Sequence, residues 1–356
     1  MPRPRTMVSG PVASCFLKLV WYMNNALGRP QKKKIVSRIK GYHGITVAAG
    51  SLTGLPNNHR SFDLPIAGIV HTGCPHYYRF GAAGESEEQF ATRCAEELEA
   101  LIIKEGGADQ VAAMICEPVM GAGGVIVPPK GYYEKIQAVC RKYDMLFVAD
   151  EVICGFGRTG NVWGCQTMGI KPDILTCAKA LSASFLPISA VMINDKVYQA
   201  LMMESDKIGT WGHGFTYSGH PVAAAVALEA QKIYDEIDLF GHAKRMTPIF
   251  QKHIQSFADH PLIGEAMSVG MVGALEVVAD KKTKAAFEIG AVGAAGTKVA
   301  NNAQALGLFV RNMGDRVAVC PPLIINEAEL ADLFGRLRQS LDAAMAELKS
   351  EGHFKG

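Results

Sequence analysis

Short apolar runs alternate with amphipathic stretches through the first part of the chain. The runs are bounded by Gly and Pro, which is typical of buried strands, and they predict strands at Lys34–Ile39, Val111–Cys116, Met145–Ala149, Ile174–Cys177 and Ala190–Ile193. Apolar residues at helical spacing predict helices at Val12–Leu27, Ser86–Glu105, Tyr132–Tyr143 and Ala223–Ile233. This alternation predicts an α/β fold whose largely parallel sheet is covered by helices on both faces.

Two of these helices carry start signals. Ser86 stands three residues before Gln89, the spacing of a capping box, and Ser218 is placed to cap the helix that contains Ala223–Ile233.

The pattern changes after Pro261, where strand-like and helical segments mix. Strands are predicted there at Met271–Val278, Leu308–Arg311 and Val317–Cys320, and helices at Ala291–Ala305 and Glu327–Leu348. Before this change, Leu239–Phe257 is also predicted to be helical. The resulting division is an irregular start at residues 1–11, a large domain at 12–244 and a smaller C-terminal α+β domain at 245–356.

Charge and cysteine usage exclude several classes of partner. No Asp or Glu precedes Asp63, while Lys and Arg recur from Arg3 to Arg60. A basic arm for nucleic acid or an organelle leader would explain this, but the stretch lacks interleaved aromatics and contains core-like apolar segments, so we expect neither. Lys18 interrupts the best candidate for a membrane span. The nine cysteines form no CxxC pair, which indicates a reducing, cytoplasmic location.

Ionisable residues end two neighbouring strands. Met145–Ala149 leads into Asp150-Glu151, and Ile174–Cys177 leads to Lys179. Adjacent strand residues point to opposite faces, so at most one of the two acids faces a given site. A carboxylate and an amine at one sheet edge are what a pyridoxal phosphate enzyme needs, because the amine forms a Schiff base and the carboxylate keeps the pyridine nitrogen protonated.

Other motifs admit structural as well as functional interpretations. The G-x-G-x-x-G of Gly155–Gly160 is not followed by a helix pattern, which argues against a dinucleotide site. Tyr42 is either a core aromatic or a ring that stacks on a cofactor. The segment His213–Ser218 is either a plain helix cap or a phosphate site. Arg311 is either a surface residue or the holder of a substrate carboxylate.

Taken in order, several segments resemble the class III, fold type I pyridoxal phosphate aminotransferases, and more narrowly their ω-amino acid:pyruvate and amine:pyruvate branch. The segments are LVWYMNNALGRPQKKKIVSR, YHGITVAAGSLTG, ICEPVMGAGGVIVPP, VADEVICGFGRTG, CAKALSASFLPISAV, HGFTYSGHPVAAAVALEA and LFVRNMGDRVAVCPPLII. The resemblance implies a fold type I large domain with a smaller C-terminal domain and pyridoxal 5'-phosphate as cofactor.

The resemblance also implies roles for individual residues. Lys179 would form the Schiff base and then move the proton at the substrate carbon, and Asp150 would pair with the pyridine nitrogen. Val152 and Tyr42 would cover the two faces of the ring, and Arg311 would bind a substrate carboxylate. The whole cofactor-binding set would be Tyr42, His43, Gly44, Glu117, Asp150, Val152, Ile153, Lys179 and Thr216.

Three further features bear on partners and substrate. Thr216 would bind the phosphate of the cofactor in a partner subunit, which implies a homodimer with a shared active site. Members that use 2-oxoglutarate resemble EP-x-x-x-E-x-G, but Ala122 stands at the position of the second glutamate. Together with Ile153, this favours pyruvate as amino acceptor and an ω-amino acid or primary amine as donor.

The match departs from the family at the start of the chain. Where the family has a glycine-serine loop that binds the cofactor phosphate, this chain has Val8-Ser9-Gly10-Pro11-Val12-Ala13-Ser14, and Pro11 offers no N–H. An N-terminal truncation with a non-homologous start would explain this. Two alternatives therefore stay open: a catalytically impaired remnant that acts as a binding or hetero-oligomeric partner, and another pyridoxal phosphate reaction, such as that of a mutase or decarboxylase.

Overall fold

Contacts between Cα atoms divide the chain into two units, which we describe separately. The computed structural model describes residues 5–9 and 12–354, and of residues 5–9, 12 and 13 it describes the backbone alone. The first unit consists of Met1–Gly121, Pro128–Phe156 and Trp163–Ile237, and the second of Ala122–Val127, Gly157–Val162 and Asp238–Gly356.

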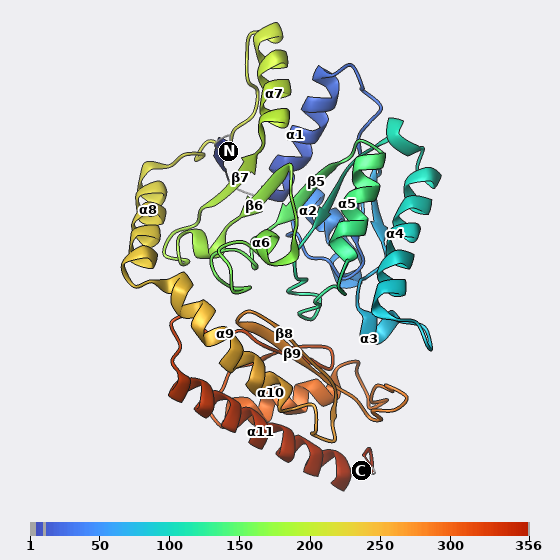
Figure 1. Ribbon diagram of the computed structural model, residues 1–356, viewed down its shortest axis with the longest axis vertical. Helices are drawn as coiled ribbons and strands as arrows, with labels where there is room; N and C mark the ends of the chain where they lie inside the picture. The colour runs from blue at the N-terminus through green and yellow to red at the C-terminus, as the bar shows by residue number, and fades with distance from the viewer. Residues whose placement is uncertain (1–4, 10–11, 355–356) are drawn as a thin grey trace. The chain divides into compact units, whose positions relative to one another are not determined.

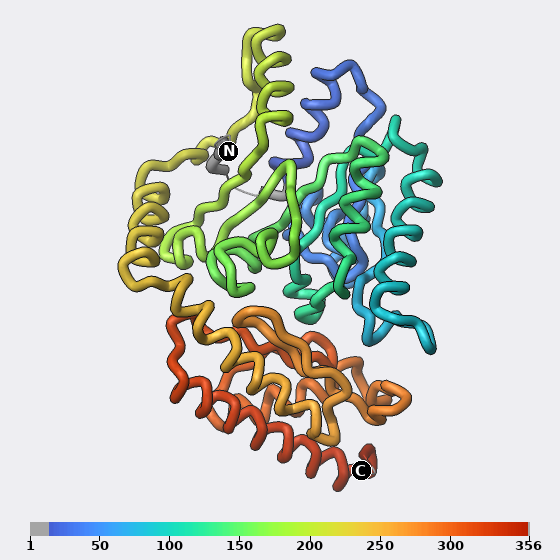
Figure 2. The backbone as a smooth tube through the Cα atoms, viewed as in Figure 1, coloured from blue at the N-terminus to red at the C-terminus, as the bar shows by residue number. Residues whose placement is uncertain are grey.

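A seven-stranded sheet forms the centre of the first unit (Figure 1). Its strands, in spatial order, are β1 (Arg5–Ser9), β7 (Ser189–Ile193), β6 (Ile174–Cys177), β5 (Leu146–Asp150), β4 (Val111–Cys116), β2 (Lys34–Arg38) and β3 (Ile69–Thr72). The strands from β6 to β3 are parallel to one another, whereas β7 is antiparallel to β6 and to β1. In Figure 2 the blue backbone of the early strands β2 and β3 lies beside the green backbone of the later strands β4, β5 and β6.

Helices cover both faces of this sheet because successive strand residues point to opposite sides. Leu146 and Val148 of β5 belong to the same buried cluster as residues of α1 (Val12–Ala26) and α7 (Asp195–Ile208). Phe147 and Ala149 pack instead with α4 (Glu87–Lys104) and α5 (Tyr132–Lys142). The predicted α/β fold with a largely parallel, doubly covered sheet is therefore confirmed.

Shorter helices and one longer helix complete the first unit. They are α2 (Val47–Leu52), α3 (Tyr77–Phe80), α6 (Gly164–Met168) and α8 (Pro221–Glu236). At the start of α4, Ser86 and Gln89 form the predicted capping box.

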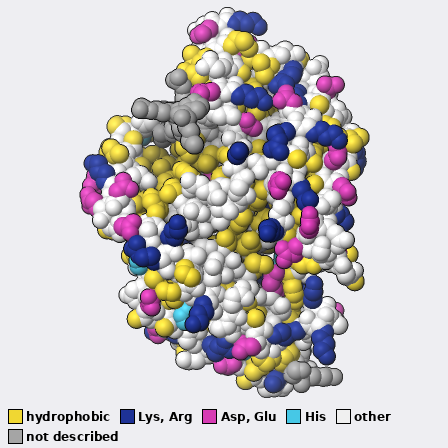
Figure 3. Space-filling view, in the orientation of Figure 1, with side chains coloured by type: hydrophobic (Ala, Val, Ile, Leu, Met, Phe, Trp, Pro, Cys, Tyr) yellow, Lys and Arg dark blue, Asp and Glu magenta, His cyan; other side chains and the backbone are white. Residues whose placement is uncertain are grey.

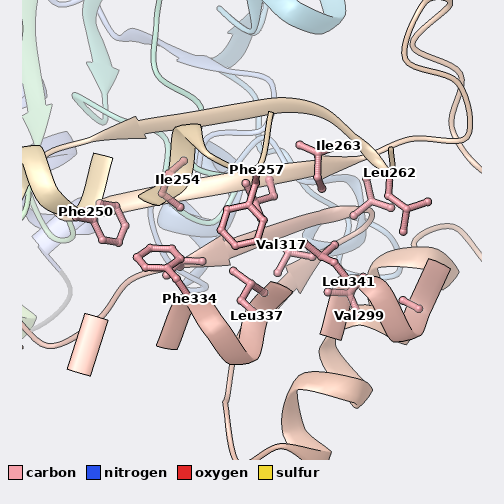
Figure 4. Packing of buried hydrophobic residues seen from close by; sticks show 14 of the residues in the cluster. Phe250, Ile254, Phe257, Leu262, Ile263, Val299, Val317, Phe334, Leu337 and Leu341 are labelled. Carbon is pink, nitrogen blue, oxygen red and sulfur yellow. The ribbon is translucent and has the colours of Figure 1, made fainter. Parts of the chain in front are cut away.

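The second unit is an antiparallel sheet packed against helices. The sheet has the order β10 (Arg311–Met313), β11 (Arg316–Val319), β9 (Val272–Val277) and β8 (Ile263–Val269), and the helices are α9 (Leu239–Gln255), α10 (Ala294–Ala305) and α11 (Glu327–Ser350). Figure 4 shows its apolar core, in which the ring of Phe334 lies 5.5 Å from that of Phe250 and 6.0 Å from that of Phe257. This unit has the α+β character predicted from the sequence.

Two predictions about individual segments are wrong, and one strand was not predicted. Residues 1–11 are not irregular throughout, because Arg5–Ser9 forms strand β1 through main-chain pairing with β7. The strand predicted at Leu308–Arg311 begins at Arg311 and runs to Met313, where it pairs with β11. Strand β8 was not predicted as a separate element. Gly10 and Pro11 of the predicted phosphate loop lie outside the described residues.

The basic run Lys32-Lys33-Lys34 has a structural explanation. The Lys33 ammonium donates to the main-chain oxygen of Trp21 in α1, Lys34 to that of Glu105 at the end of α4, and Lys32 to that of Tyr143 at the end of α5. For Lys34 and Lys32, whose acceptors lie at helix ends, the cation is stabilised by carbonyl groups that lack a partner within the helix, whereas Trp21 lies inside α1. This run therefore explains part of the early basic excess without a nucleic-acid partner.

Hydropathy bears on the membrane question as well. Within residues 5–9 and 12–354, none of the helices combines the length and apolar character that crossing a bilayer requires.

Candidate active site

Four parallel strands of the first unit bring polar residues to one edge of the sheet. Tyr42 and His43 follow β2, Glu117 follows β4, Asp150 ends β5 and Lys179 follows β6. Open α/β folds place their sites outside this carboxyl edge. Here a cavity of about 300 Å³ is lined by residues that include Tyr42, His43, Gly44, Glu117, Asp150, Val152, Ile153 and Lys179. Eight of the predicted site residues therefore line one cavity.

Asp150 is buried in the wall of this cavity and held from two sides. Its Oδ2 lies 2.7 Å from His43 Nδ1, and its Oδ1 accepts a hydrogen bond of 3.1 Å from the main-chain N–H of Val152. An ionised carboxylate can only accept, so an ionised Asp150 requires His43 to donate from Nδ1. Only 5% of Asp150 is exposed, so its carboxylate is directed by these bonds rather than by solvent.

Glu151 points the other way, as the alternation of strand residues requires. Its carboxylate accepts hydrogen bonds from the main-chain N–H groups of Gly164, at 2.8 Å, and Cys165, at 2.6 Å. Burial raises the pKa of Glu151 above its ordinary value, and these hydrogen bonds oppose that rise. Glu151 therefore tethers the segment that begins α6, and of this acidic pair Asp150 alone lines the cavity.

Lys179 adopts a backbone conformation that is uncommon for a residue with a side chain. It opens a 3₁₀ turn, Lys179–Leu181, with φ of 46°, in the left-handed region. Such a conformation in a non-glycine residue costs about 1–3 kcal/mol and is concentrated at functional sites. The turn carries the lysine away from the direction of β6, and its side chain is exposed while it lines the cavity.

Glu117 lines the cavity and also binds the backbone of two loops, those of Tyr42 and Gly121. Its Oε1 accepts a hydrogen bond from the main-chain N–H of Tyr42, at 3.0 Å, and its Oε2 accepts one from that of Gly121, at 2.9 Å. Burial raises the pKa of the Glu117 carboxyl, and the neighbouring Asp150 adds to the rise. The link between His43 and Asp150 and the two bonds of Glu117 were not predicted from the sequence. The one available signal was that each residue follows a buried strand.

Two predicted site residues lie outside the lining of this cavity. Thr216 is exposed in the segment before α8, where His220, and not the predicted Ser218, caps the helix by accepting from Val222 N–H. Ser218 accepts instead from the N–H of Phe215 within that segment. Arg311 is an exposed residue of β10 in the second unit.

Comparisons with known proteins agree on one family. A profile of the aminotransferase class-III family matches residues 4–341. The chain is 48% identical over 338 residues to gamma-aminobutyrate transaminase 1, mitochondrial, of Oryza sativa subsp. indica, a match that covers 94% of this chain and 65% of that protein. This chain thus spans about 65% of the length of that curated relative.

Solved structures are similar over most of the chain. A structure described as a transaminase with L-ala has a TM-score of 0.94 and 56% identity, and the match covers 96% of this chain and 81% of that one. The omega transaminase from Pseudomonas jessenii in complex with PMP has a TM-score of 0.95 and 52% identity, covering 98% and 77%. By sequence profile, by curated relatives and by structure, the chain belongs to the class III aminotransferases, a family of fold type I proteins that use pyridoxal phosphate.

Proposed function

We propose that the protein is a pyridoxal phosphate-dependent aminotransferase that moves an amino group from an ω-amino acid or a primary amine to pyruvate. The observation that carries this proposal is that Lys179 and Asp150, 29 positions apart by their residue numbers, line the same cavity at the carboxyl edge of one sheet. An amine and a buried carboxylate in one cavity of this size are the two groups that the cofactor requires.

The residues present fit the cofactor chemically. The cavity offers a primary amine that can bind an aldehyde carbon, a carboxylate that can hold a protonated ring nitrogen, and an aromatic side chain, Tyr42, that can cover a flat ring. His43 Nε2 is buried and has no hydrogen-bond partner within the described chain, so the wall of the cavity retains one unused polar group. When bound, pyridoxal phosphate supplies an electron sink for the carbanion that forms at the substrate carbon.

Asp150 and Lys179 would divide the proton chemistry between them. Asp150, oriented by His43 and by the N–H of Val152, would keep a proton on the ring nitrogen. The Lys179 amine would bind the cofactor and, once released, take a proton from the substrate carbon and return it. Its exposure and its place in a tight turn leave the amine accessible to an entering substrate.

Thr216 and Arg311 have proposed roles outside this cavity. Thr216 is exposed, and we assign it to the phosphate of a cofactor held by the partner subunit of a homodimer. Arg311 is exposed on its strand and is free to pair with the carboxylate of an amino or keto acid.

The choice of pyruvate depends on Ala122. A glutamate at this position would compete with a substrate carboxylate for an arginine, and the alanine leaves that arginine available to a small keto acid. Two comparisons support the substrate class: one relative is named for gamma-aminobutyrate, an ω-amino acid, and one similar structure contains L-alanine, the product of pyruvate amination.

The location is part of the proposal. Eight of the nine cysteines are buried, in keeping with small apolar thiols in a reducing cytosol. The rice relative is named as mitochondrial, so fractionation of the native cell should decide between the two compartments.

Spectroscopy and product analysis test the proposal together. Protein loaded with pyridoxal phosphate should lose its visible absorbance on addition of gamma-aminobutyrate or a primary amine, and pyruvate should restore it with formation of alanine. Formation of glutamate from 2-oxoglutarate with pyruvate ignored would overturn the acceptor. Release of carbon dioxide without amino transfer would indicate a decarboxylase, and a protein that stays colourless with excess cofactor would indicate a remnant without activity.

A further inference from the structure

Arg38 is a fully buried cation behind the active-site cavity. It ends β2 and is 0% exposed. Its Nη2 donates to the main-chain oxygen of Glu117, at 2.6 Å, and its Nη1 donates to the Tyr133 hydroxyl, at 3.0 Å. Its Nε has no partner, and within the described residues no carboxylate forms an ion pair with it. Burying a charge against neutral acceptors is unfavourable for stability, so the arrangement calls for a functional explanation.

Arg38 and Tyr133 converge on the main chain of Glu117. The Tyr133 hydroxyl, which accepts from Arg38, lies 2.5 Å from the carbonyl oxygen of Glu117 and donates to it. The guanidinium also lies 5.9 Å from the centre of the Tyr133 ring. One carbonyl is therefore held by groups from β2 and from α5, which fixes the backbone just beyond the end of β4.

The fixed Glu117 in turn holds two walls of the cavity. Through its two carboxylate oxygens it binds the main-chain N–H groups of Tyr42 and Gly121. Tyr42 lines the cavity directly. Gly121 packs so closely on Ile153, another lining residue, that a Cβ at position 121 would lie 2.5 Å from its Cδ1. Both carboxylate oxygens of Glu117 thus act on the loops that shape the cavity.

We propose that Arg38 is a positioning residue for the active site: together with Tyr133 it fixes Glu117, and Glu117 then holds the Tyr42 loop and the Gly121 turn on either side of the cofactor cavity. The effect on catalysis rests on the proposed function, whereas the hydrogen bonds among Arg38, Tyr133 and Glu117 do not depend on it. Glu117 is accordingly a support for the cavity wall, in addition to the direct cofactor contact expected for it.

Amide hydrogen exchange on the protein without cofactor tests the proposal. In Arg38→Lys and in Tyr133→Phe, the amides of Tyr42 and Gly121 should exchange about tenfold faster, because a hydrogen bond to a charged group contributes on that order. Ile136→Val is the matched control, since Ile136 is buried on the same helix as Tyr133 and its side chain has no polar atom that could bond the carbonyl of Glu117. Tyr133→Phe removes a single hydroxyl and serves if Arg38→Lys does not fold.

Glu117→Gln provides the positive reference. An amide has one acceptor oxygen, so at least one of the two amides should lose its protection. Exchange at Tyr42 and Gly121 that is the same in Tyr133→Phe as in Ile136→Val, at equal free energy of unfolding, would overturn the proposal.

Cofactor binding supplies a second readout. With pyridoxal phosphate, Tyr133→Phe should weaken binding about tenfold and shift the pH dependence of the bound absorbance, and Ile136→Val should do neither. A wild-type protein that binds no cofactor would count against the proposed function and leave the exchange result intact. If Tyr133→Phe binds pyridoxal phosphate normally and its Tyr42 and Gly121 amides exchange at the wild-type rate, the positioning role of Arg38 is contradicted and the proposed function is not.

Discussion

The two units treat buried charge in opposite ways. In the second unit, Arg316 is buried between Glu265, at 2.5 Å, and Glu276, at 2.7 Å, so a cation faces its counter-charges directly. In the first unit, Asp150 is buried beside an imidazole and, within the described residues, no Lys or Arg forms an ion pair with it. In the second unit, buried charge is thus paired with opposite charge, whereas in the first unit the Asp150 carboxylate lines a cavity beside an imidazole.

The contrast extends to the surroundings of these charges. In the second unit, Arg316 and Glu276 alternate along β11 and β9 with Val317 and Leu275 of the apolar core, so these charges lie on the face of the sheet opposite that core. The first unit places its buried polar residues where four parallel strands end, and the space-filling view in Figure 3 shows hydrophobic side chains gathered on one hollowed face near α8. Buried charge is thus paired with opposite charge in one unit and faces a cavity in the other.

The sharpest way to break this comparison is to remove the amine. Lys179→Ala should lower the rate of amino transfer by a factor on the order of 10⁴ or more, because it removes the amine that we propose binds the cofactor and moves the proton. The free energy of unfolding should change little, since the Lys179 side chain is exposed and the strain of the left-handed backbone, which arises from the Cβ, is the same for alanine. Lys171→Ala, at an exposed lysine before the same strand, should keep wild-type activity in the same steady-state assay.

The ion pair of the second unit should show the reverse pattern. Arg316→Met should lower the free energy of unfolding by about 3–5 kcal/mol, because the buried carboxylate of Glu276 and the partly buried one of Glu265 lose their cation. Urea denaturation would measure this loss. In the control Arg336→Met, which breaks an exposed pair with Asp332, the change should be at most about 1 kcal/mol. Equal effects for the two variants would remove the distinction that we draw between the units.

Replacing the site carboxylate tests the other half of the comparison. Asp150→Asn keeps the shape of the side chain but removes its charge, and we expect the rate to fall by about 10²- to 10³-fold, the range seen when one preorganised electrostatic group is lost. Stability should change much less than in Arg316→Met. A variant with the wild-type rate would show that Asp150 has no electrostatic role.

The smallest expected effect concerns the second acid of the pair. Burial raises the pKa of Glu151, so the native state binds a proton more tightly than the unfolded chain, for which the ordinary value is 4.5. The stabilisation that comes from the protonated Glu151 carboxyl is fully present below pH 4.5 and is lost as the pH rises through the raised pKa of the native state. The free energy of unfolding of the wild type should therefore fall over this window relative to that of Glu151→Gln. Parallel curves for the two proteins would contradict the assignment.

The sequence predicted those features that depend on neighbouring residues. Apolar runs located β4, β5 and β6 almost to the residue, and the Ser86 capping box located the start of α4, because both signals are local. The strand ends then identified Lys179 and Asp150 as residues of one sheet edge.

Long-range features could not be predicted in this way. Strand β1 exists through main-chain pairing with β7, about which Arg5–Ser9 carries no local signal. His43 and Asp150 form a bond across 107 residues, and Arg38 reaches Glu117 across 79. The start of α8 could not be located exactly, because Ser218 and His220 can both supply a capping acceptor. The helix begins at Pro221 with His220 as its cap, two residues after the predicted cap.

The central claim is that Lys179 and Asp150 serve one cofactor in one cavity. The most direct measurement is borohydride reduction of the protein mixed with pyridoxal phosphate, followed by mass spectrometry of its peptides. The account predicts a single stable pyridoxyl label on Lys179, with much less label in Asp150→Asn under the same conditions. Label spread over surface lysines, with no preference for Lys179, would contradict it.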